Sequence, residues 1–213
     1  MKTASKHRKE FTPVKINIGI DEKLYLKDPN SSELGLNIVR VSIELIDDIG
    51  FEAFTFKKLA ARIGASEPSV YRYFESKHKL LLYLLAWYWN YMDYQLILAT
   101  ANIHSPAERL TTAVRLLTRP LEKDPGFAHV DETALYRIVV AESSKSYLIK
   151  DVDEVNKDGF FLGYKRLCNR VASIVTEINP AYRFPRALIS TVIESSHDQK
   201  YFAEHLPSLT DVS

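Results

Sequence analysis

Residues 36–82 read LNIVRVSIELIDDIGFEAFTFKKLAARIGASEPSVYRYFESKHKLLL, and this stretch decides the fold. Its first apolar residues recur every three or four positions, as on one face of a helix: Ile38, Val41, Leu45 and Ile49. Gly50 follows this series directly, and glycine readily takes the left-handed conformation found after helix ends. The pattern therefore predicts a helix that stops at Gly50.

A second, shorter helix is predicted directly after it. Thr55 has the side chain of a favoured N-cap residue, and Leu59 and Ile63 are spaced to face inward. Ala60 is small, as a close helix crossing requires, and Gly64 follows four residues later. Because glycine takes positive φ without strain, a tight turn is predicted at Gly64.

A third helix is predicted beyond this turn. Ser66 is a favoured N-cap residue, and Glu67 and Pro68 are both favoured in a first helical turn. Apolar residues spaced for the core come next: Val70, Tyr73 and Phe74. Ser76 is expected to cap a fourth helix. A small residue, a glycine four positions later and a short capped helix together describe a helix-turn-helix.

The short third helix is expected to present its outer face to DNA. Its first turn is suited to the major groove, and its exposed residues would be Glu67, Ser69, Tyr71 and Arg72. Tyr71, Arg72 and Lys77 are placed to reach phosphates. The backbone amides that begin the second and fourth helices are placed in the same way.

The stretch resembles the DNA-binding domain of the TetR/AcrR family of transcriptional regulators. The similarity runs through GFEAFTFKKLAARIGASEPSVYRYFESKHKLL at residues 50–81 and covers about 45 residues in all, roughly a fifth of the chain. The glycines, the apolar spacing, the Tyr-x-x-Phe pair and the Ser-Lys that follows it all coincide. The resemblance implies a DNA-reading head that acts in transcription.

The resemblance implies a set of DNA-contacting residues in and beside the second and third helices: Thr55, Phe56, Lys57, Glu67, Pro68, Ser69, Tyr71, Arg72 and Lys77. Within this set, Thr55 and Lys77 would hold the phosphate backbone. Residues 67–69 would lie against bases, and Tyr71 and Arg72 would lie on phosphates.

Two features depart from the family pattern. Many members have lysine and glycine or alanine where this chain has Glu67 and Pro68. Glu67 cannot attract phosphate, but it can accept from a cytosine amino group or complement the helix dipole. The Pro68 ring suits a thymine methyl group. The chain also begins about 30 residues before the family's usual first helix, and its basic residues 2–9 fit either a minor-groove arm or a solvated tail.

The rest of the chain is also predicted to be helical, so the expected fold class is all-α. Long stretches lack both glycine and proline: 69–105, 127–158 and 164–179. Ser105 and Pro106 form a helix start, a helix is expected over residues 133–148, Pro180 stops a long apolar stripe and Pro185 opens the last helix. The segment from Ser76 to about Thr100 is apolar nearly all round, which is typical of a central buried helix: its aromatic residues include Trp87, Tyr88 and Trp89.

Residues 14–27 are the exception to the helical pattern. Apolar residues alternate there with polar ones, as in a strand: Val14, Ile16, Ile18 and Ile20. Asp21 and Glu22 make a poor two-residue turn, so a short β-hairpin and an irregular arm are equal alternatives.

An arm is expected at residues 1–31, ahead of the family's usual first helix. The resemblance further implies a helix-turn-helix domain at 32–80 and an all-helical domain at 81–213. The last domain would bind a small-molecule effector and form a homodimer through its last two long helices, about 159–178 and 185–205. The interface candidates, each equally compatible with intramolecular core, are Phe160, Tyr164, Leu167, Val171, Ile174, Leu188, Val192 and Phe202. Pocket candidates, none of them assigned to a ligand, are Trp87, Tyr91, Tyr94, His104, His129, Tyr136 and Tyr147.

Composition supports an ordinary globular protein rather than a disordered one. Hydrophobic residues make up 46% and charged residues 26% of the 213 residues, and the net charge is only +1. Cys168 is the single cysteine, which excludes an internal disulfide framework. The longest apolar stretch, residues 80–89, is too short to cross a bilayer. We therefore expect a cytoplasmic protein without a membrane partner.

Neither an enzyme nor a cofactor is expected. The sequence has no phosphate-binding glycine loop and no nucleophile elbow, and His197 and His205 are too far apart on one helix to chelate a metal alone. The prediction is a homodimeric, ligand-responsive repressor that binds an inverted repeat in double-stranded DNA. The alternative is a ligand-binding or protein-interaction module that keeps the helix-turn-helix only as a scaffold.

Overall fold

The computed structural model describes residues 18–119, 121, 127, 129–148, 150 and 152–212, and within them the chain forms helices and no strand. The α-helices are α1 (Glu33–Ala53), α2 (Phe56–Ile63), α3 (Glu67–Tyr71), α4 (Lys77–Thr100), α5 (Pro106–Thr118), α6 (Glu132–Glu142), α7 (Ser144–Tyr147), α8 (Val152–Lys157), α9 (Leu162–Ile178) and α10 (Pro185–His205). The all-α prediction is confirmed. Over the same residues, no helix combines the length and the apolar character that a membrane span needs.

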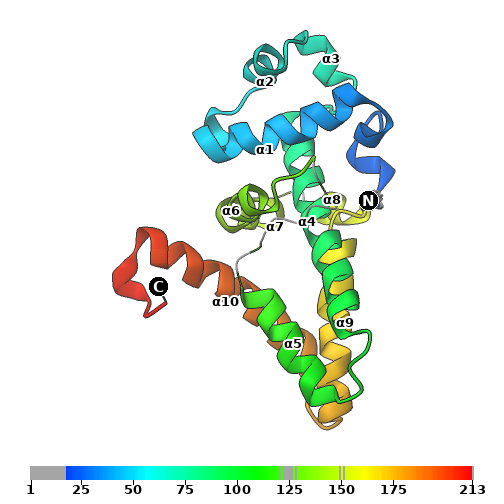
Figure 1. The fold of residues 1–213 in the computed structure, drawn as a ribbon, viewed down its shortest axis with the longest axis vertical. Helices are drawn as coiled ribbons and strands as arrows, with labels where there is room; N and C mark the ends of the chain where they lie inside the picture. Colours follow the sequence, from blue (N-terminus) through cyan, green and yellow to red (C-terminus); the bar gives the residue numbers. More distant parts are fainter. Residues whose placement is uncertain are drawn as a thin grey trace, which may run out of the picture.

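Helices α1, α2 and α3 form a small bundle, called the head below, at one end of the long helix α4 (Figure 1). The bundle closes around fully buried side chains: Leu59, Val70 and Phe74. Phe74 lies edge-on to Tyr83 of α4, with ring centroids 5.3 Å apart. The first turns of α4 are therefore part of the core of the head.

Helices α4 to α10 are called the body below. Helix α9 packs along α4, α5 and α10, and the second half of α10 extends away from this bundle (Figure 1). From Leu80 to Trp89, helix α4 is buried on every side, because each of these residues is inaccessible or nearly so. The predicted central helix from Ser76 to about Thr100 is thus confirmed.

Residues 18–31, called the strap below, contain no strand. The Oδ1 atom of Asp21 accepts a hydrogen bond from the backbone N–H of Lys23 at 3.0 Å and starts a short 3-10 helix at Glu22–Leu24. An aspartate cap favours a helical turn at Asp21 and Glu22, where a β-hairpin would need the turn that joins its two strands. The hairpin alternative is therefore wrong for residues 18–27, whereas residues 14–17 and the basic arm lie outside the described residues.

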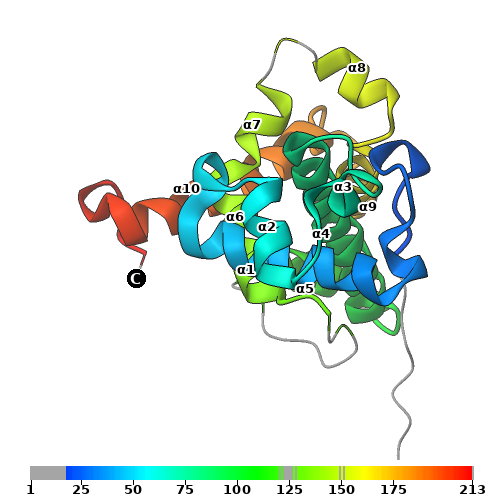
Figure 2. The same cartoon turned by 90° about the horizontal axis from the view of Figure 1, so that it is seen from above.

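The strap joins the head to the body. The backbone N–H of Leu26 donates to the carbonyl of Tyr73, just after α3, at 2.8 Å. The Asn90 side chain on α4 donates to the carbonyl of Gly19 at 3.0 Å, and Lys23 Nζ donates to the carbonyl of Lys157 at 3.3 Å. Figure 2 shows the strap running beside the head and the body.

Three predicted helix caps are confirmed and one is not. Thr55, Ser76 and Ser105 each accept a hydrogen bond from the backbone N–H three residues later, at 3.2 to 3.4 Å. Ser66 precedes α3 as predicted but makes no capping bond. Its hydroxyl lies 2.7 Å from that of Ser69 instead, because the two side chains satisfy each other.

The helix predicted over residues 133–148 is interrupted. Helix α6 ends before Ser143, and the short α7 follows it. Both the backbone N–H and the hydroxyl of Ser146 donate to the carbonyl of Ser143, at 2.9 and 2.6 Å. This local serine bonding competes with the regular helical pattern. As a result, Leu148 leaves the predicted apolar face and is 77% exposed.

Several predicted interface residues belong to the core of a single chain. Those exposed by 6% or less are Phe160, Leu167, Val171 and Ile174. For these residues the structure shows the alternative of intramolecular core. The three that lie on α9 are buried because α4, α5 and α10 of the same chain cover its apolar face. Leu188 is 38% exposed, and the other candidates are half-buried: Tyr164, Val192 and Phe202.

Candidate nucleic-acid interface and ligand cleft

The turn between α2 and α3 has the geometry predicted for a helix-turn-helix. Gly64 ends α2 with φ 67° and ψ 30°, and the backbone N–H of Ala65 donates to the carbonyl of Ala60 at 2.9 Å. No atom lies within 4 Å of the position that a Cβ on Gly64 would occupy. Glycine is favoured here by the left-handed backbone and not by lack of space. Gly50 likewise has positive φ, 77°, as predicted.

The outer face of α3 carries the residues predicted to read DNA. Pro68 and Arg72 are exposed and Tyr71 is 47% exposed, whereas Glu67 and Ser69 are half-buried. Arg72 Nη2 donates to the Ser69 hydroxyl at 3.4 Å, a long contact that leaves the guanidinium largely in solvent. The head therefore brings these five side chains onto one accessible surface.

The start of α2 offers side chains of two kinds. Thr55 and Lys57 are exposed at the surface. The Phe56 side chain is only 4% exposed, and its ring lies 4.9 Å from that of Tyr71, centroid to centroid. The backbone N–H of Phe56, in the first turn of α2, is the part of this residue left to contact a phosphate. The buried Phe56 ring thus supports the Tyr71 ring from the core side.

Lys77 has a structural role that its sequence position did not indicate. Its Nζ atom donates to the carbonyls of Phe51, Glu52 and Phe54, at 3.1, 3.2 and 3.3 Å. The same ammonium lies 4.7 Å from the centre of the Phe51 ring. The side chain thus satisfies carbonyl groups that the end of α1 leaves open. The backbone N–H of Lys77 lies in the first turn of α4, where no carbonyl of the helix accepts a hydrogen bond from it.

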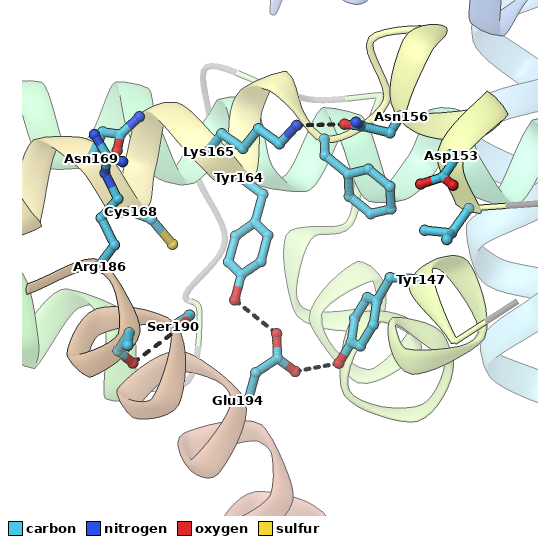
Figure 3. A pocket seen from close by; sticks show the side chains of 13 residues that line it. Tyr147, Asp153, Asn156, Tyr164, Lys165, Cys168, Asn169, Arg186, Ser190 and Glu194 are labelled. Carbon is cyan, nitrogen blue, oxygen red and sulfur yellow. Dashed lines mark hydrogen bonds between the residues drawn. The ribbon is translucent and has the colours of Figure 1, made fainter. Parts of the chain in front are cut away.

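A cleft of about 750 Å³ lies in the body between α7, α8, α9 and α10 (Figure 3). Its surface is mostly apolar, and residues from all four helices line it, including Tyr147, Val152, Phe161, Tyr164 and Glu194. Ligand sites commonly combine such walls with a few placed polar groups. The cleft therefore has the size and the lining of a small-molecule site.

Glu194 is the polar centre of this cleft. The hydroxyls of Tyr147 and Tyr164 donate to its two carboxylate oxygens, at 2.6 and 2.8 Å (Figure 3). Burial, together with the Glu194 carboxylate, raises the pKa of both phenols well above the ordinary value. Both tyrosines therefore remain protonated and fix the carboxylate as hydrogen-bond donors.

Comparison with known proteins supports the predicted resemblance. Residues 38–84, which run from the first half of α1 into α4, match the family model described as bacterial regulatory proteins, tetR family. This segment is that of a TetR-family DNA-binding head. The predicted resemblance is therefore confirmed, and it rests on the same segment that contains the helix-turn-helix.

Two tetracycline repressor proteins of Escherichia coli are similar to this chain over a short stretch. The class C protein is 39% identical over 44 residues, which are 21% of this chain and 20% of that protein. The class A protein from transposon 1721 is 34% identical over 44 residues, with the same coverage of each chain. The match spans about a fifth of the length of these relatives.

A solved structure resembles the chain over most of its length. The crystal structure of the superantigen PfiT covers 88% of this chain and 92% of its own, with a TM-score of 0.56 and 14% sequence identity. At this identity the likeness shows a shared fold alone.

The TetR-family resemblance led us to expect a pocket between the central helices, and most of the proposed pocket residues are not at the cleft. The Trp87 and Tyr91 rings stack on each other with centroids 5.2 Å apart, and Phe127 packs edge-on against both. These rings fill the space between the helices themselves. Tyr136 lines a second cleft, of about 350 Å³, and Tyr147 lines the large one. Glu194 and Tyr164 were missed as site residues because nothing in their local sequence marks them.

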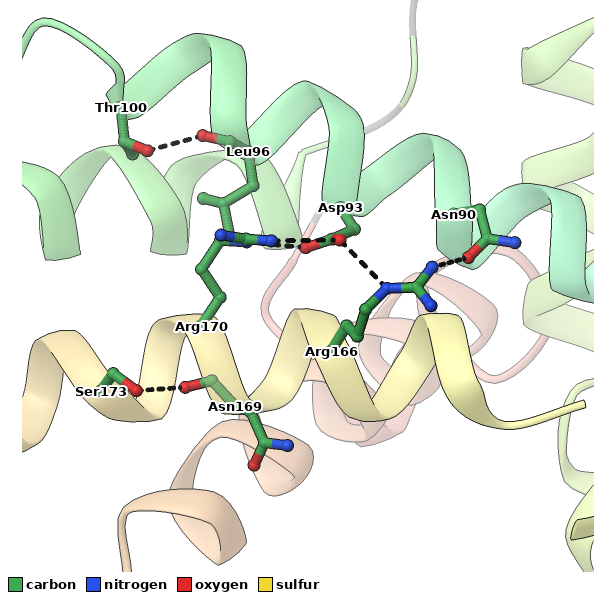
Figure 4. Close-up of polar contacts among 8 residues, drawn as sticks. All are labelled: Asn90, Asp93, Leu96, Thr100, Arg166, Asn169, Arg170 and Ser173. Atoms are coloured by element: carbon green, nitrogen blue, oxygen red, sulfur yellow. Dashed lines mark hydrogen bonds and ion pairs between the residues drawn. The ribbon is translucent and has the colours of Figure 1, made fainter. Parts of the chain in front are cut away.

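A buried carboxylate ties the cleft helix α9 to the long helix α4. Asp93 on α4 is 6% exposed and accepts from Arg170 Nε at 2.8 Å. Arg166 Nε lies 3.5 Å from the same carboxylate, and its Nη2 donates to Asn90 at 2.6 Å (Figure 4). Tyr164 and Cys168 on α9 line the cleft, so α9 contacts the cleft on one side and α4 on another.

Cys168 lies at the edge of the cleft and is 9% exposed. Burial raises the pKa of its thiol to about 11, so the sulfur stays protonated and is a poor nucleophile. The side chain therefore packs as a small apolar group. Across the part of the chain that the structure describes, no group of three His, Cys, Asp or Glu side chains is arranged to hold a metal ion.

Proposed function

We propose that this chain is a sequence-specific DNA-binding transcriptional repressor that acts as a homodimer and responds to a small-molecule effector. The observation that carries the proposal is the exposed outer face of α3, which a helix-turn-helix turn holds on a buried core. Tyr71 is 47% exposed there, beside the exposed Pro68 and Arg72. A helix presented in this way fits the major groove, which is about 12 Å wide.

The first turn of α3 is the proposed base-reading segment. Glu67 would accept from a cytosine amino group, the Pro68 ring would contact a thymine methyl group, and Ser69 would pair with either kind of edge. None of the three carries a positive charge. Their contribution would therefore be to sequence preference more than to overall affinity.

The proposed phosphate contacts surround this segment. Side chains on phosphates would be those of Thr55, Lys57, Tyr71 and Arg72. Phe56 and Lys77 would contribute through the backbone N–H groups at the starts of α2 and α4, since helix N-termini favour anions.

The proposed dimer surface lies on α9, α10 and the loop between them. Large apolar side chains that are 38 to 63% exposed follow this surface: Leu162, Ile178, Phe184 and Leu188. Exposed large apolar side chains are typical of a surface that a partner covers, and three of these lie at the end of α9, in the loop and at the start of α10. A second copy placed by a twofold axis would cover the same side chains on both chains and set the two α3 helices about one turn of DNA apart.

The effector would act by favouring one separation of the two heads. The proposed route starts at the cleft, passes from α9 to α4 through Arg170 and Asp93, and reaches the head along α4. At the head, Lys77 holds the end of α1. A ligand shifts such an equilibrium only as far as it binds one arrangement better than the other.

Selection from a random pool of double-stranded DNA tests the proposal, with purified full-length protein at near-physiological salt. The expected result is an enriched inverted repeat that Arg72→Ala binds more weakly. Arg115→Ala removes an exposed arginine from the body and serves as the matched control. A folded, dimeric protein that enriches no sequence after unfolding and refolding without ligand would contradict the proposal. It would favour the alternative in which the head is a scaffold for ligand or protein binding.

A further inference from the structure

The Glu194 carboxylate forms no ion pair with any described residue of the chain, although it lies in a mostly apolar cleft. Each of its oxygens accepts one tyrosine hydroxyl. A carboxylate oxygen can accept two hydrogen bonds, so each oxygen retains one acceptor position. A half-buried negative charge held in place by two neutral donors is complementary to a cation.

The cations of the cleft do not supply this partner. Lys165 Nζ donates to the side-chain oxygen of Asn156, at the opposite wall from Glu194 (Figure 3). Arg186 is eight residues before Glu194 on α10, which corresponds to about 12 Å along a helix axis. Among the described residues, Glu194 thus faces the cleft without a positive charge beside it.

The walls near Glu194 favour the apolar part of an organic cation. Tyr147 and Tyr164 place phenol rings on either side of the carboxylate, and Phe161 and Val152 add apolar surface. Aromatic faces attract cations as well as apolar groups. A volume of about 750 Å³ accepts a molecule of drug-like size.

We infer that the cleft binds an organic cation, namely an amine or ammonium group carried on an aromatic or aliphatic body. The cationic group lies at Glu194 and the body lies along Phe161 and Val152. This inference names the ligand class of the cleft, and it rests on the proposed function only for its effect on DNA. Binding itself needs only the fold.

Calorimetric titration of the full-length protein tests the ligand class with three probes of one shape: naphthylethylammonium, naphthylethanol and naphthylacetate. We expect the cation to bind at least about tenfold more tightly than the alcohol, as a hydrogen bond to a charged group allows, and the anion to bind most weakly. Glu194→Gln keeps the shape of the side chain and should remove the preference for the cation while the alcohol still binds.

Asp198→Asn is the matched control, because Asp198 is an exposed carboxylate one helical turn beyond Glu194 and outside the cleft lining. It should retain the preference for the cation. Equal binding of the cation and the alcohol, or a preference that survives Glu194→Gln, would overturn the inference. Tyr147→Phe and Tyr164→Phe each remove one donor, and each should weaken cation binding severalfold less than Glu194→Gln does.

Two further measurements distinguish this inference from a role of Glu194 in dimerisation and from the proposed function. Sedimentation velocity should give Glu194→Gln the oligomeric state of the unsubstituted protein; loss of that state would assign the carboxylate to a cation of a second copy and overturn the inference. DNA binding is then titrated with naphthylethylammonium, which should weaken it. Cation binding without any effect on bound DNA would support the cleft assignment and contradict the effector-responsive part of the proposed function. Specific DNA binding by a protein that shows no preference for the cation would do the reverse.

Discussion

The residues of the proposed DNA-binding site are close together in the sequence, whereas those that meet in the cleft are far apart. Every residue proposed to contact DNA lies between Thr55 and Lys77, in α2 or α3, directly beside them, or at the first residue of α4. In the cleft, Glu194 is 47 positions from Tyr147 and 30 from Tyr164. The head is therefore specified by local signals and the cleft by the packing of distant helices. Substitutions that act on one region and spare the other measure how independent the two are.

The largest effect is expected from the core of the head. Phe74 is fully buried against Tyr83, so Phe74→Ala should lower the free energy of unfolding by about 3–5 kcal/mol. DNA binding should be lost with it. Chemical denaturation checks the stability, with Leu98→Ala as control, because Leu98 on α4 is 54% exposed and should change it by less than about 1 kcal/mol.

Phe74→Ala also tests whether a destabilised head affects ligand binding in the cleft. If the cleft is specified independently, calorimetric binding of naphthylethylammonium should survive at temperatures where the DNA-binding face is already disordered. Simultaneous loss of both activities in one transition would show instead that α4 unites head and body into a single cooperative unit.

A smaller effect is expected at the turn of the head. Gly64→Val places a β-branched residue at φ 67° and should cost about 2 kcal/mol, through backbone strain and not through a clash. Gly64→Asn is the matched control, since asparagine tolerates this conformation better. Thermal unfolding should rank glycine above asparagine above valine. Equal stability of the valine and asparagine variants would contradict the role assigned to the left-handed turn.

Local rules predicted the head because each of its signals acts within a few residues. The caps at Thr55 and Ser76 and the positive φ at Gly64 need only their immediate neighbours. The same rules failed where a side chain had a choice of partners. Ser66 pairs with Ser69 instead of capping α3, and Lys77 reaches carbonyls more than twenty residues away.

Local rules could not find the cleft because its parts become neighbours only after folding. The aromatic residues of α4 were plausible pocket walls by composition, yet Trp87 and Tyr91 stack against each other in the core. Glu194 is one of many glutamates in the sequence, and only its two tyrosine partners distinguish it. Fold class can be predicted from periodicity alone, whereas predicting a cleft also requires knowing which helices cross.

Acid should weaken the body through one buried histidine. His197 on α10 is 3% exposed among the rings of Tyr88, Trp89 and Tyr136, and burial lowers its pKa from 6.5 to about 4. Between pH 6.5 and pH 4, the His197 side chain is protonated in the unfolded chain and stays neutral in the folded chain. Stability should therefore fall by up to about 1.4 kcal/mol for each pH unit as the pH decreases from about 6.5.

Denaturation at several pH values from 5 to 6.5 checks this slope. His197→Phe keeps the ring and removes the titrating group, so its slope should be smaller by up to one proton. His205→Phe alters an exposed histidine at the end of the same helix and should leave the slope as it is. An unchanged slope in His197→Phe would mean that other groups cause the loss of stability in acid.

The smallest effect distinguishes two cations of the head. Lys77→Met keeps most of the aliphatic stem but removes the ammonium that binds three carbonyls, and it should cost about 1 kcal/mol of stability. Because this ammonium is already engaged, the salt dependence of DNA binding should remain that of the unsubstituted protein. Arg72→Ala removes an exposed guanidinium and should lower the salt slope by about 1 without a comparable loss of stability. Binding titrations at four salt concentrations, paired with denaturation, separate the two. A reduced slope in Lys77→Met would show that the ammonium leaves the end of α1 for a phosphate when DNA binds.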